Sequence, residues 1–122
     1  MHKIEFHCGD VGAVGTLTTI LAGLLTQKEL VAKGAELVTA AKHCPVAVFC
    51  NDEGVLLGLR VAVARLELAE DPDVTVYEHH TNKNPLVGSI NRYGRLSDYP
   101  AVFDHHMDII CELLSARSKE KK

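Results

Sequence analysis

The chain has 122 residues and a formal net charge of −3, with 47% hydrophobic and 24% charged residues. This length fits one domain with its own hydrophobic core, and the composition is that of an ordinary globular protein. The acidic balance argues against a long basic surface wrapped by nucleic acid, because phosphate neutralisation needs clustered Lys and Arg.

Targeting signals and cysteines indicate a reduced, intracellular setting. The opening "MHKIEFHCGD" carries charge where a signal peptide has an apolar stretch, so we expect no secretory leader. No apolar run reaches the roughly 18 residues that a membrane span needs. The four cysteines have no close pairing pattern, which favours reduced thiols in a cytoplasmic protein.

The first third of the chain alternates between strand and helix patterns. Residues 3–8 alternate loosely and predict a short strand. Apolar positions at 3.6-residue spacing predict a helix over residues 14–27, capped by Thr16 or Asp10. We then expect a very short strand around Val31 and a second helix over residues 34–43, begun by a glycine.

The rest of the chain continues this alternation. The apolar run at residues 45–51 predicts a buried central strand, and an apolar stripe predicts a helix over residues 53–69. Residues 73–79 predict another strand. The turn-rich stretch at 81–100 predicts a short helix and a strand or hairpin, and residues 101–118 predict the last helix. The predicted class is α/β, with helices covering a small mixed sheet.

A glycine-rich stretch, "GDVGAVG", lies between the first predicted strand and the first predicted helix. Gly9, Gly12 and Gly15 are spaced so that a phosphate could sit on the helix N-terminus. However, the G-x-G-x-x-G fingerprint is absent and no Lys-Ser/Thr pair follows. The other interpretation is a flexible lead into the helix.

The histidines include the adjacent pairs His79-His80 and His105-His106, together with His7 in "HCGD". Neighbouring side chains on a strand point to opposite faces, and on a helix they diverge by about 100 degrees. Zinc-ligand spacings such as C-x-x-C and H-x-x-x-H are absent from the sequence. We therefore expect no bound metal and identify no catalytic triad.

Three longer strings stand out in the chain: "AKGAELVTAAKHCPVAVFCNDEG", "DVTVYEHHTNKNPLVGSI" and "ELLSARSKEKK". They resemble the kink-turn-binding ribosomal-protein superfamily, and within it a eukaryotic small-subunit member. The resemblance covers about residues 14 to 122. The later turn matches in kind at Asn82, Lys83, Leu86 and Gly88.

This resemblance implies a three-layer α-β-α sandwich over residues 14–118, with an N-terminal extension at 1–13 and a basic tail at 119–122. It implies a non-enzymatic structural constituent of the small ribosomal subunit in the cytoplasm. The expected partners are ribosomal RNA and other small-subunit proteins. Neither a cofactor, a small-molecule substrate nor a membrane is expected.

The chain departs from the superfamily's Gly-x-Asn-Glu-x-x-Lys motif. Gly34 matches, but Glu36, Leu37 and Ala40 replace the groups that read bases. What remains can position phosphates without reading sequence. In the resembling fold the start of the second helix and the turn before the last strand lie side by side. The expected RNA-binding edge then comprises Lys28, Lys33, Gly34, Asn82, Lys83 and Arg92.

The alternative hypothesis is a small α/β enzyme or ligand-binding domain. It would use the loop of Gly9, Gly12 and Gly15 for a phosphate group, with a histidine as general base.

Overall fold

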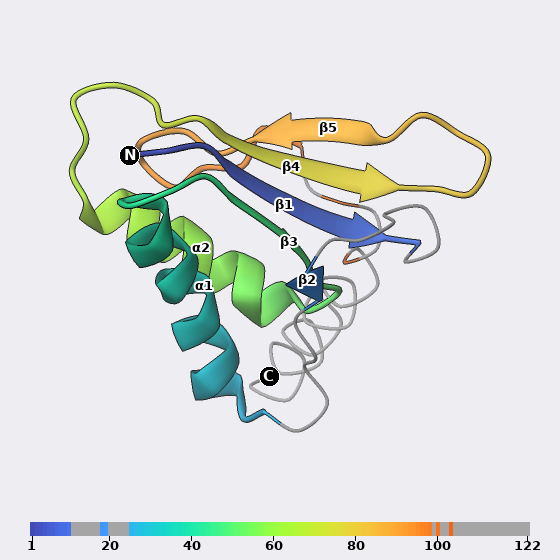
Figure 1. Ribbon diagram of the computed structural model, residues 1–122, viewed down its shortest axis with the longest axis horizontal. Helices are drawn as coiled ribbons and strands as arrows, with labels where there is room; N and C mark the ends of the chain where they lie inside the picture. Colours follow the sequence, from blue (N-terminus) through green and yellow to red (C-terminus); the bar gives the residue numbers. More distant parts are fainter. Residues whose placement is uncertain (11–17, 20–24, 99, 101–102, 104–122) are drawn as a thin grey trace, which may run out of the picture.

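The computed structural model describes residues 1–10, 18–19, 25–98, 100 and 103. These described residues form a five-stranded sheet in the order β2-β3-β1-β4-β5 and two helices (Figure 1). The strands are β1 (Ile4–Gly9), β2 (Thr18–Thr19), β3 (Val46–Phe49), β4 (Val74–His79) and β5 (Leu86–Ser89). The helices are α1 (Gln27–Ala41) and α2 (Glu53–Arg65).

Strand β1 is the centre of the sheet. It pairs in parallel with β3 on one side and with β4 on the other, so that Ile4 lies between Val46 and Val74. Strand β2 runs parallel to β3, whereas β5 runs antiparallel to β4. The predicted α/β class with a small mixed sheet is confirmed. Because four strands are parallel, the carboxyl ends of β1, β3 and β4 meet at one edge.

The hydrophobic core lies between the sheet and the two helices. Alternate residues of β1, Ile4, Phe6 and Cys8, are fully buried, and Leu59 of α2 joins the same cluster. Both helices lie on the same side of the sheet in Figure 1. The described residues therefore account for two of the three layers expected of an α-β-α sandwich.

Helix α1 corrects two sequence predictions. The expected short strand at Val31 is wrong, because Val31 lies inside α1, and Gly34 lies in the middle of this helix rather than at its start. The helix begins earlier because Thr26 and Glu29 form a capping box, each satisfying a backbone N–H of the first turn. Gly34 is retained in the helix because its backbone packs directly against α2.

The helix predicted over residues 14–27 is wrong at Thr18 and Thr19, and of its described positions only Gln27, the first residue of α1, is helical. Thr18 and Thr19 form β2 and pair with Val48 and Phe49 of β3. Threonine is β-branched and suits an extended strand, which overrides the helical spacing of its apolar neighbours. Residues 14–17 and 20–24 of that prediction lie outside the described residues.

The other predictions from residue patterns have mixed outcomes. The strands at 3–8, 45–51 and 73–79 are confirmed as β1, β3 and β4, although β1 rather than β3 is central. The predicted N-terminal extension, residues 1–13, therefore contains an integral strand. Helix α2 ends at Arg65, before the predicted residue 69.

The turn-rich stretch contains the predicted hairpin strand, β5, and its described residues 81–98 contain no helix. Apart from the buried Phe103, the last predicted helix, residues 101–118, lies outside the described residues, as does the basic tail, residues 119–122. Among the helices that the structure describes, none has the length and apolar character needed to cross a bilayer.

Candidate functional site

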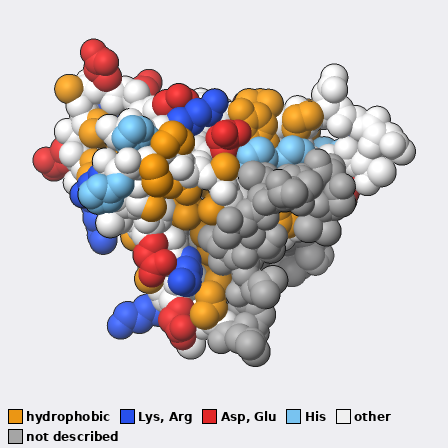
Figure 2. Space-filling view, viewed as in Figure 1, with side chains coloured by type: hydrophobic (Ala, Val, Ile, Leu, Met, Phe, Trp, Pro, Cys, Tyr) orange, Lys and Arg blue, Asp and Glu red, His pale blue; other side chains and the backbone are white. Residues whose placement is uncertain are grey.

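Polar side chains gather where β1 and β4 end. In open α/β sheets, ligands bind at the carboxyl ends of the parallel strands. Figure 2 shows histidine side chains close together over this part of the sheet. His7 comes from β1, while His79 comes from the end of β4 and His80 follows it. This edge is the candidate functional site.

A hydrogen bond joins two of these histidines across the strands. Nδ1 of His7 lies 2.7 Å from Nε2 of His79. The two rings are stacked with centroids 5.0 Å apart, and the ring of Tyr77 stacks on His7 at 4.7 Å. All three side chains project from the sheet face opposite the helices, since they alternate with the core residues of β1 and β4. The sheet register therefore builds an ordered imidazole pair.

A carboxylate orients the pair from the other side. Oε1 of Glu5 lies 3.4 Å from Nε2 of His7. An ionised carboxylate only accepts hydrogen bonds, so the proton of a neutral His7 belongs on Nε2. Its Nδ1 must then accept from the Nε2–H of His79. In the neutral pair this leaves Nδ1 of His79 unprotonated and available as a base.

The environment of His7 favours its neutral form. Burial lowers the pKa of His7 below the ordinary value of 6.5, and the neighbouring His79 lowers it further, while Glu5 acts in the opposite direction. A neutral imidazole near neutral pH can accept a hydrogen bond, as the pairing with His79 requires. The site therefore has the electrostatics of a proton-transfer couple.

Two sets of hydrogen bonds fix the strand ends beneath the histidines. Asn51, after β3, accepts from the N–H of Gly9 at 2.7 Å and donates to the carbonyl of Gly9 at 2.8 Å. Asp10 accepts from the backbone N–H of Thr81 at 2.6 Å and from its hydroxyl at 2.7 Å. These bonds lower the pKa of Asp10. The carboxylate of Asp10 thus accepts both hydrogen bonds from Thr81 and links the end of β1 to the turn after β4.

Gly9 has a structural reason to be glycine. Its φ angle is +95°, and a β-carbon built there would lie 2.2 Å from the carbonyl oxygen of His79. The close approach lets the end of β1 lie directly beside His79. Gly12 and Gly15, the other members of the predicted phosphate loop, lie outside the described residues.

The nearby thiols are poor nucleophiles. Cys8 is fully buried, and burial raises its pKa to about 12. Burial also raises the pKa of Cys50. Both thiols are therefore protonated near neutral pH, and a thiolate is the nucleophilic form. Cysteine chemistry does not suit this edge.

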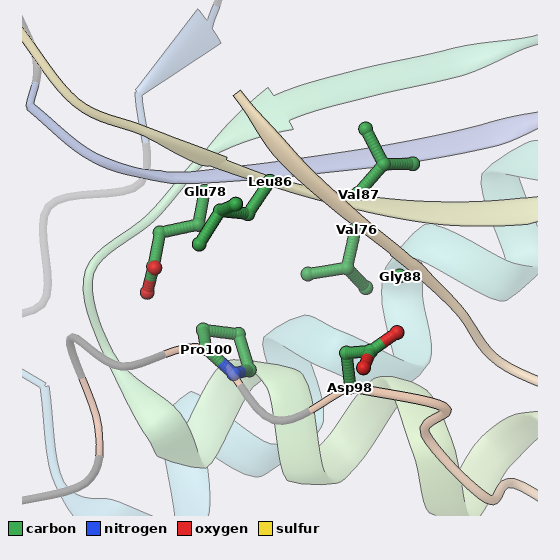
Figure 3. A pocket seen from close by; sticks show the side chains of 7 residues that line it. All are labelled: Val76, Glu78, Leu86, Val87, Gly88, Asp98 and Pro100. Carbon is green, nitrogen blue, oxygen red and sulfur yellow. The ribbon is translucent and has the colours of Figure 1, made fainter. Parts of the chain in front are cut away.

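A small cavity lies beneath β4 and β5 on the helical side of the sheet (Figure 3). Its volume is about 90 Å³, well below that of pockets for drug-sized ligands, about 300–1,000 Å³. Glu78 lines it, and Oε1 of Glu78 lies 2.8 Å from Nε2 of His80. The lining residues are Val76, Glu78, Leu86, Val87, Gly88, Asp98 and Pro100.

The predicted RNA-binding residues on α1 differ in how available they are for contact with RNA. Lys28 is exposed at the start of the helix. Nζ of Lys33 forms an ion pair with Glu36 at 3.3 Å. Gly34 is buried, and a β-carbon there would lie 2.1 Å from the carbonyl oxygen of Val55 in α2. Its backbone therefore faces α2, so it cannot offer the phosphate contact expected at a helix start.

The remaining predicted residues lie elsewhere. Asn82 and Lys83 form the exposed turn between β4 and β5, far from the start of α1 in Figure 1. Arg92 follows β5 at the other end of that hairpin. Its guanidinium donates to the carbonyl of Ala69, and its backbone N–H donates to Asp71. The structure does not bring the six residues into one arc, because β5 carries the chain away from Lys83 before Arg92.

The pairing of His7 with His79 was not predicted from the sequence. The predicted separation of the adjacent His79 and His80 is confirmed, since His80 contacts Glu78 instead. The missing information was the parallel register of β1 and β4, which sets Gly9 opposite His79. The only sequence feature that could have indicated this pairing was the alternating strand pattern around each of the two histidines. His105 and His106 lie outside the described residues.

Comparisons with protein families, with curated proteins and with solved structures gave no match to this chain. Within the part of the chain that the structure describes, no three His, Cys, Asp or Glu side chains are placed to hold a metal ion.

Proposed function

We propose that the chain binds a small polar substrate at the carboxyl edge of its sheet and that His79 acts there as a general base. The 2.7 Å hydrogen bond between His7 and His79 carries this proposal. A general base needs an unprotonated nitrogen held in a fixed direction, and a third group commonly orients it. Glu5 and His7 supply that orientation for His79.

The division of roles follows from the geometry. His79 is partly exposed and His7 is buried, so His79 is the ring that a substrate could reach. His7 is a positioning residue that holds Nε2–H of His79. When His79 takes a proton from the substrate, the imidazolium is stabilised through His7 by the carboxylate of Glu5. The reaction class is proton transfer, as in ester hydrolysis or proton abstraction next to a carbonyl.

Hydrolysis of p-nitrophenyl acetate tests this proposal. We expect wild-type protein to hydrolyse the ester about tenfold faster than His79→Asn, a modest effect for general-base catalysis on an arbitrary substrate. Glu5→Gln should cause a smaller loss. His43→Asn is the matched control, because His43 is exposed after the end of α1. Equal rates for wild type and His79→Asn would contradict the proposal.

A second candidate is a structural role in the small ribosomal subunit, as the resemblance to eukaryotic small-subunit ribosomal protein twelve implies. The observation that favours it is a group of cations on the helical layer, where Lys28, Lys42 and Arg65 line one groove. Such cations can contact phosphates even on a chain of net charge −3.

Co-sedimentation with small ribosomal subunits tests the second candidate. If it is right, the tagged protein will sediment with the subunit, and Lys28→Glu combined with Lys42→Glu will reduce incorporation while circular dichroism stays unchanged. Normal incorporation of the double variant would contradict an RNA contact at this groove. Failure of the wild-type protein to co-sediment would contradict the ribosomal role itself.

A further inference from the structure

A shallow groove runs between α1 and α2 on the outer side of the helical layer, away from the sheet. Its volume is about 400 Å³. The residues that line it are mostly small and apolar, with three cations among them. They are Lys28, Val31, Ala32, Ala35, Val38, Thr39, Lys42, Gly58, Val61, Ala62, Arg65 and Leu66.

On α1 the lining forms one stripe with a cation at each end. Lys28 and Lys42 stand fourteen positions apart, with Val31, Ala35 and Thr39 between them at helical spacing. At about 1.5 Å per residue, the two lysines are separated by about 21 Å along the helix. About four helical turns, apolar except for Thr39, thus separate the two positive ends.

On α2 the stripe is shorter and ends in a third cation. Val61 and Ala62 face the groove one turn before Arg65 and Leu66. Arg65 is exposed, whereas Val61, Ala62 and Leu66 are half-buried. The apolar floor of the groove therefore receives contributions from both helices.

A close helix contact makes this floor continuous. A β-carbon built on Gly58 would lie 2.0 Å from the carbonyl oxygen of Val31. The two backbones therefore touch at this point, with no side chain between them. The groove is a fixed feature of the α1–α2 pair, since separating the helices would remove this contact.

The charge of the groove is opposite to that of the chain. Among its lining residues three are cations and none is acidic, although the whole chain has a net charge of −3. The nearby Lys33 is paired with Glu36 and lies outside the lining. A partner that fits must combine an apolar surface with negative charge.

We propose that this groove binds an acidic amphipathic helix of a protein partner. Helix-in-groove recognition places apolar anchors at i, i+3, i+4 and i+7 in an apolar channel. Here the apolar anchors of the partner helix would contact Val31, Ala35 and Val61. Carboxylates at the ends of the partner helix would pair with the cations that line the groove. The proposal concerns a different face from the His7–His79 site and does not depend on it.

Nucleic acid fits this groove less well than a peptide does. Phosphate backbones need cations in a polar channel, and single strands add aromatic side chains on which bases stack. The lining offers neither an aromatic ring nor, apart from Thr39, a neutral polar side chain. The apolar floor would stay unpaired beneath a nucleic acid, whereas an amphipathic helix would cover it.

Fluorescence anisotropy with a synthetic acidic amphipathic helix tests the proposal. The probe has leucines at i, i+3, i+4 and i+7 and glutamates at both ends, and it is compared with labelled oligouridylate. We expect the wild-type chain to bind the peptide with a dissociation constant of about 10 μM, and oligouridylate at least about tenfold more weakly.

Charge-reversal variants show whether the groove is the binding site. Lys28→Glu, Lys42→Glu and Arg65→Glu together should weaken peptide binding about 30-fold, since each cation would become a repulsive group. The matched control reverses Lys33, Lys83 and Arg95 to glutamate, which changes the net charge equally outside the lining. The control should bind within about threefold of wild type.

Three results would overturn the proposal. The first is the absence of peptide binding to the wild-type chain. The second is an equal loss in the two triple variants, which would indicate attraction by overall charge. The third is tighter binding of oligouridylate than of peptide, which would assign the cations to RNA. Ala35→Glu, a single change at an exposed position in the floor, provides an independent check and should weaken binding without altering thermal unfolding.

Discussion

At the scale of single residues, His7 is held by groups on both sides of its ring. Its side chain lies between Glu5 and His79 and is stacked on Tyr77. Charging His7 would place a cation in a buried position beside a second imidazole, which is why its pKa is lowered. The single carboxylate of Glu5 favours the charged form of His7, but it offsets only part of the effect of burial and of His79.

The lowered pKa of His7 predicts a loss of stability in acid. The unfolded chain, with an ordinary histidine pKa near 6.5, binds a proton at a higher pH than the folded chain does. The contribution of His7 to the free energy of unfolding is therefore fully present above pH 6.5, and it is lost as the pH falls toward the lowered folded-state pKa. Urea unfolding from about pH 7.5 to pH 5 should show this decrease, and His7→Gln should reduce the slope. An unchanged slope in His7→Gln would contradict the lowered pKa.

The cysteines predict selective labelling. Cys8 and Cys50 are fully buried, whereas Cys44 is exposed after α1. In a Cys111→Ser background, a thiol reagent should modify Cys44 rapidly and the two buried thiols only on unfolding. Cys44→Ser is the control and should abolish the fast phase. Rapid labelling of Cys50 in native protein would contradict its placement at the buried end of β3.

At the scale of elements, the two helices depend on glycines where they meet. Gly34 and Gly58 leave room for backbone-to-backbone contact, and a β-carbon at either position would lie within about 2 Å of the other helix. Glycine is ordinarily unfavourable in a helix interior by about 1 kcal/mol relative to alanine. Packing therefore overrides local propensity at these two positions.

Substitution of Gly58 by alanine should destabilise the protein despite a better helix propensity. The added methyl group must push α1 away at Val31, and overpacking of this kind costs about 1–3 kcal/mol. Urea unfolding measures the change in the free energy of unfolding. Thr39→Ala, at an exposed position of α1, is the control and should change it by less than about 0.5 kcal/mol. A stabilising effect of Gly58→Ala would contradict the close helix contact.

The start of α1 provides a second test at this scale. Thr26 accepts a hydrogen bond from the N–H of Glu29, and the Glu29 side chain reaches back to the N–H of Thr26. Thr26→Ala should lower the free energy of unfolding by about 1 kcal/mol, because it leaves a backbone donor without its partner. Thr26→Ser keeps the hydroxyl and should restore most of that loss. No difference between these two variants would contradict the capping box.

Residue patterns predicted the elements best where they carried a long apolar run or regular spacing. The runs around Phe6, Val48 and Val76 predicted three strands, and the stripe of α2 predicted a helix. Patterns failed at Gly34, which was taken as a helix start. The reason for this glycine is a contact with Val55 and Leu59, which are distant in the sequence, so local spacing could not indicate it.

At the scale of the whole molecule, the site depends on strand order. His7 and His79 are 72 positions apart and meet because β1 and β4 are parallel neighbours in register. Alternation of helices and strands predicted the α/β class but could not give this order. The same topology separates Lys83 from Arg92, so the basic edge expected from the resemblance is not assembled among the described residues.

The ring protons of the two histidines test the central claim most directly. Two-bond ¹H–¹⁵N NMR spectra near neutral pH distinguish which nitrogen of each imidazole carries the proton. We predict protons on Nε2 of both His7 and His79, an unprotonated Nδ1 on His79, and loss of this fixed tautomer in His7→Gln. Exposed His43 serves as the internal reference for a ring without such a partner. A His79 ring protonated on Nδ1, or a mixture of tautomers matching that of His43, would contradict the proton-transfer couple.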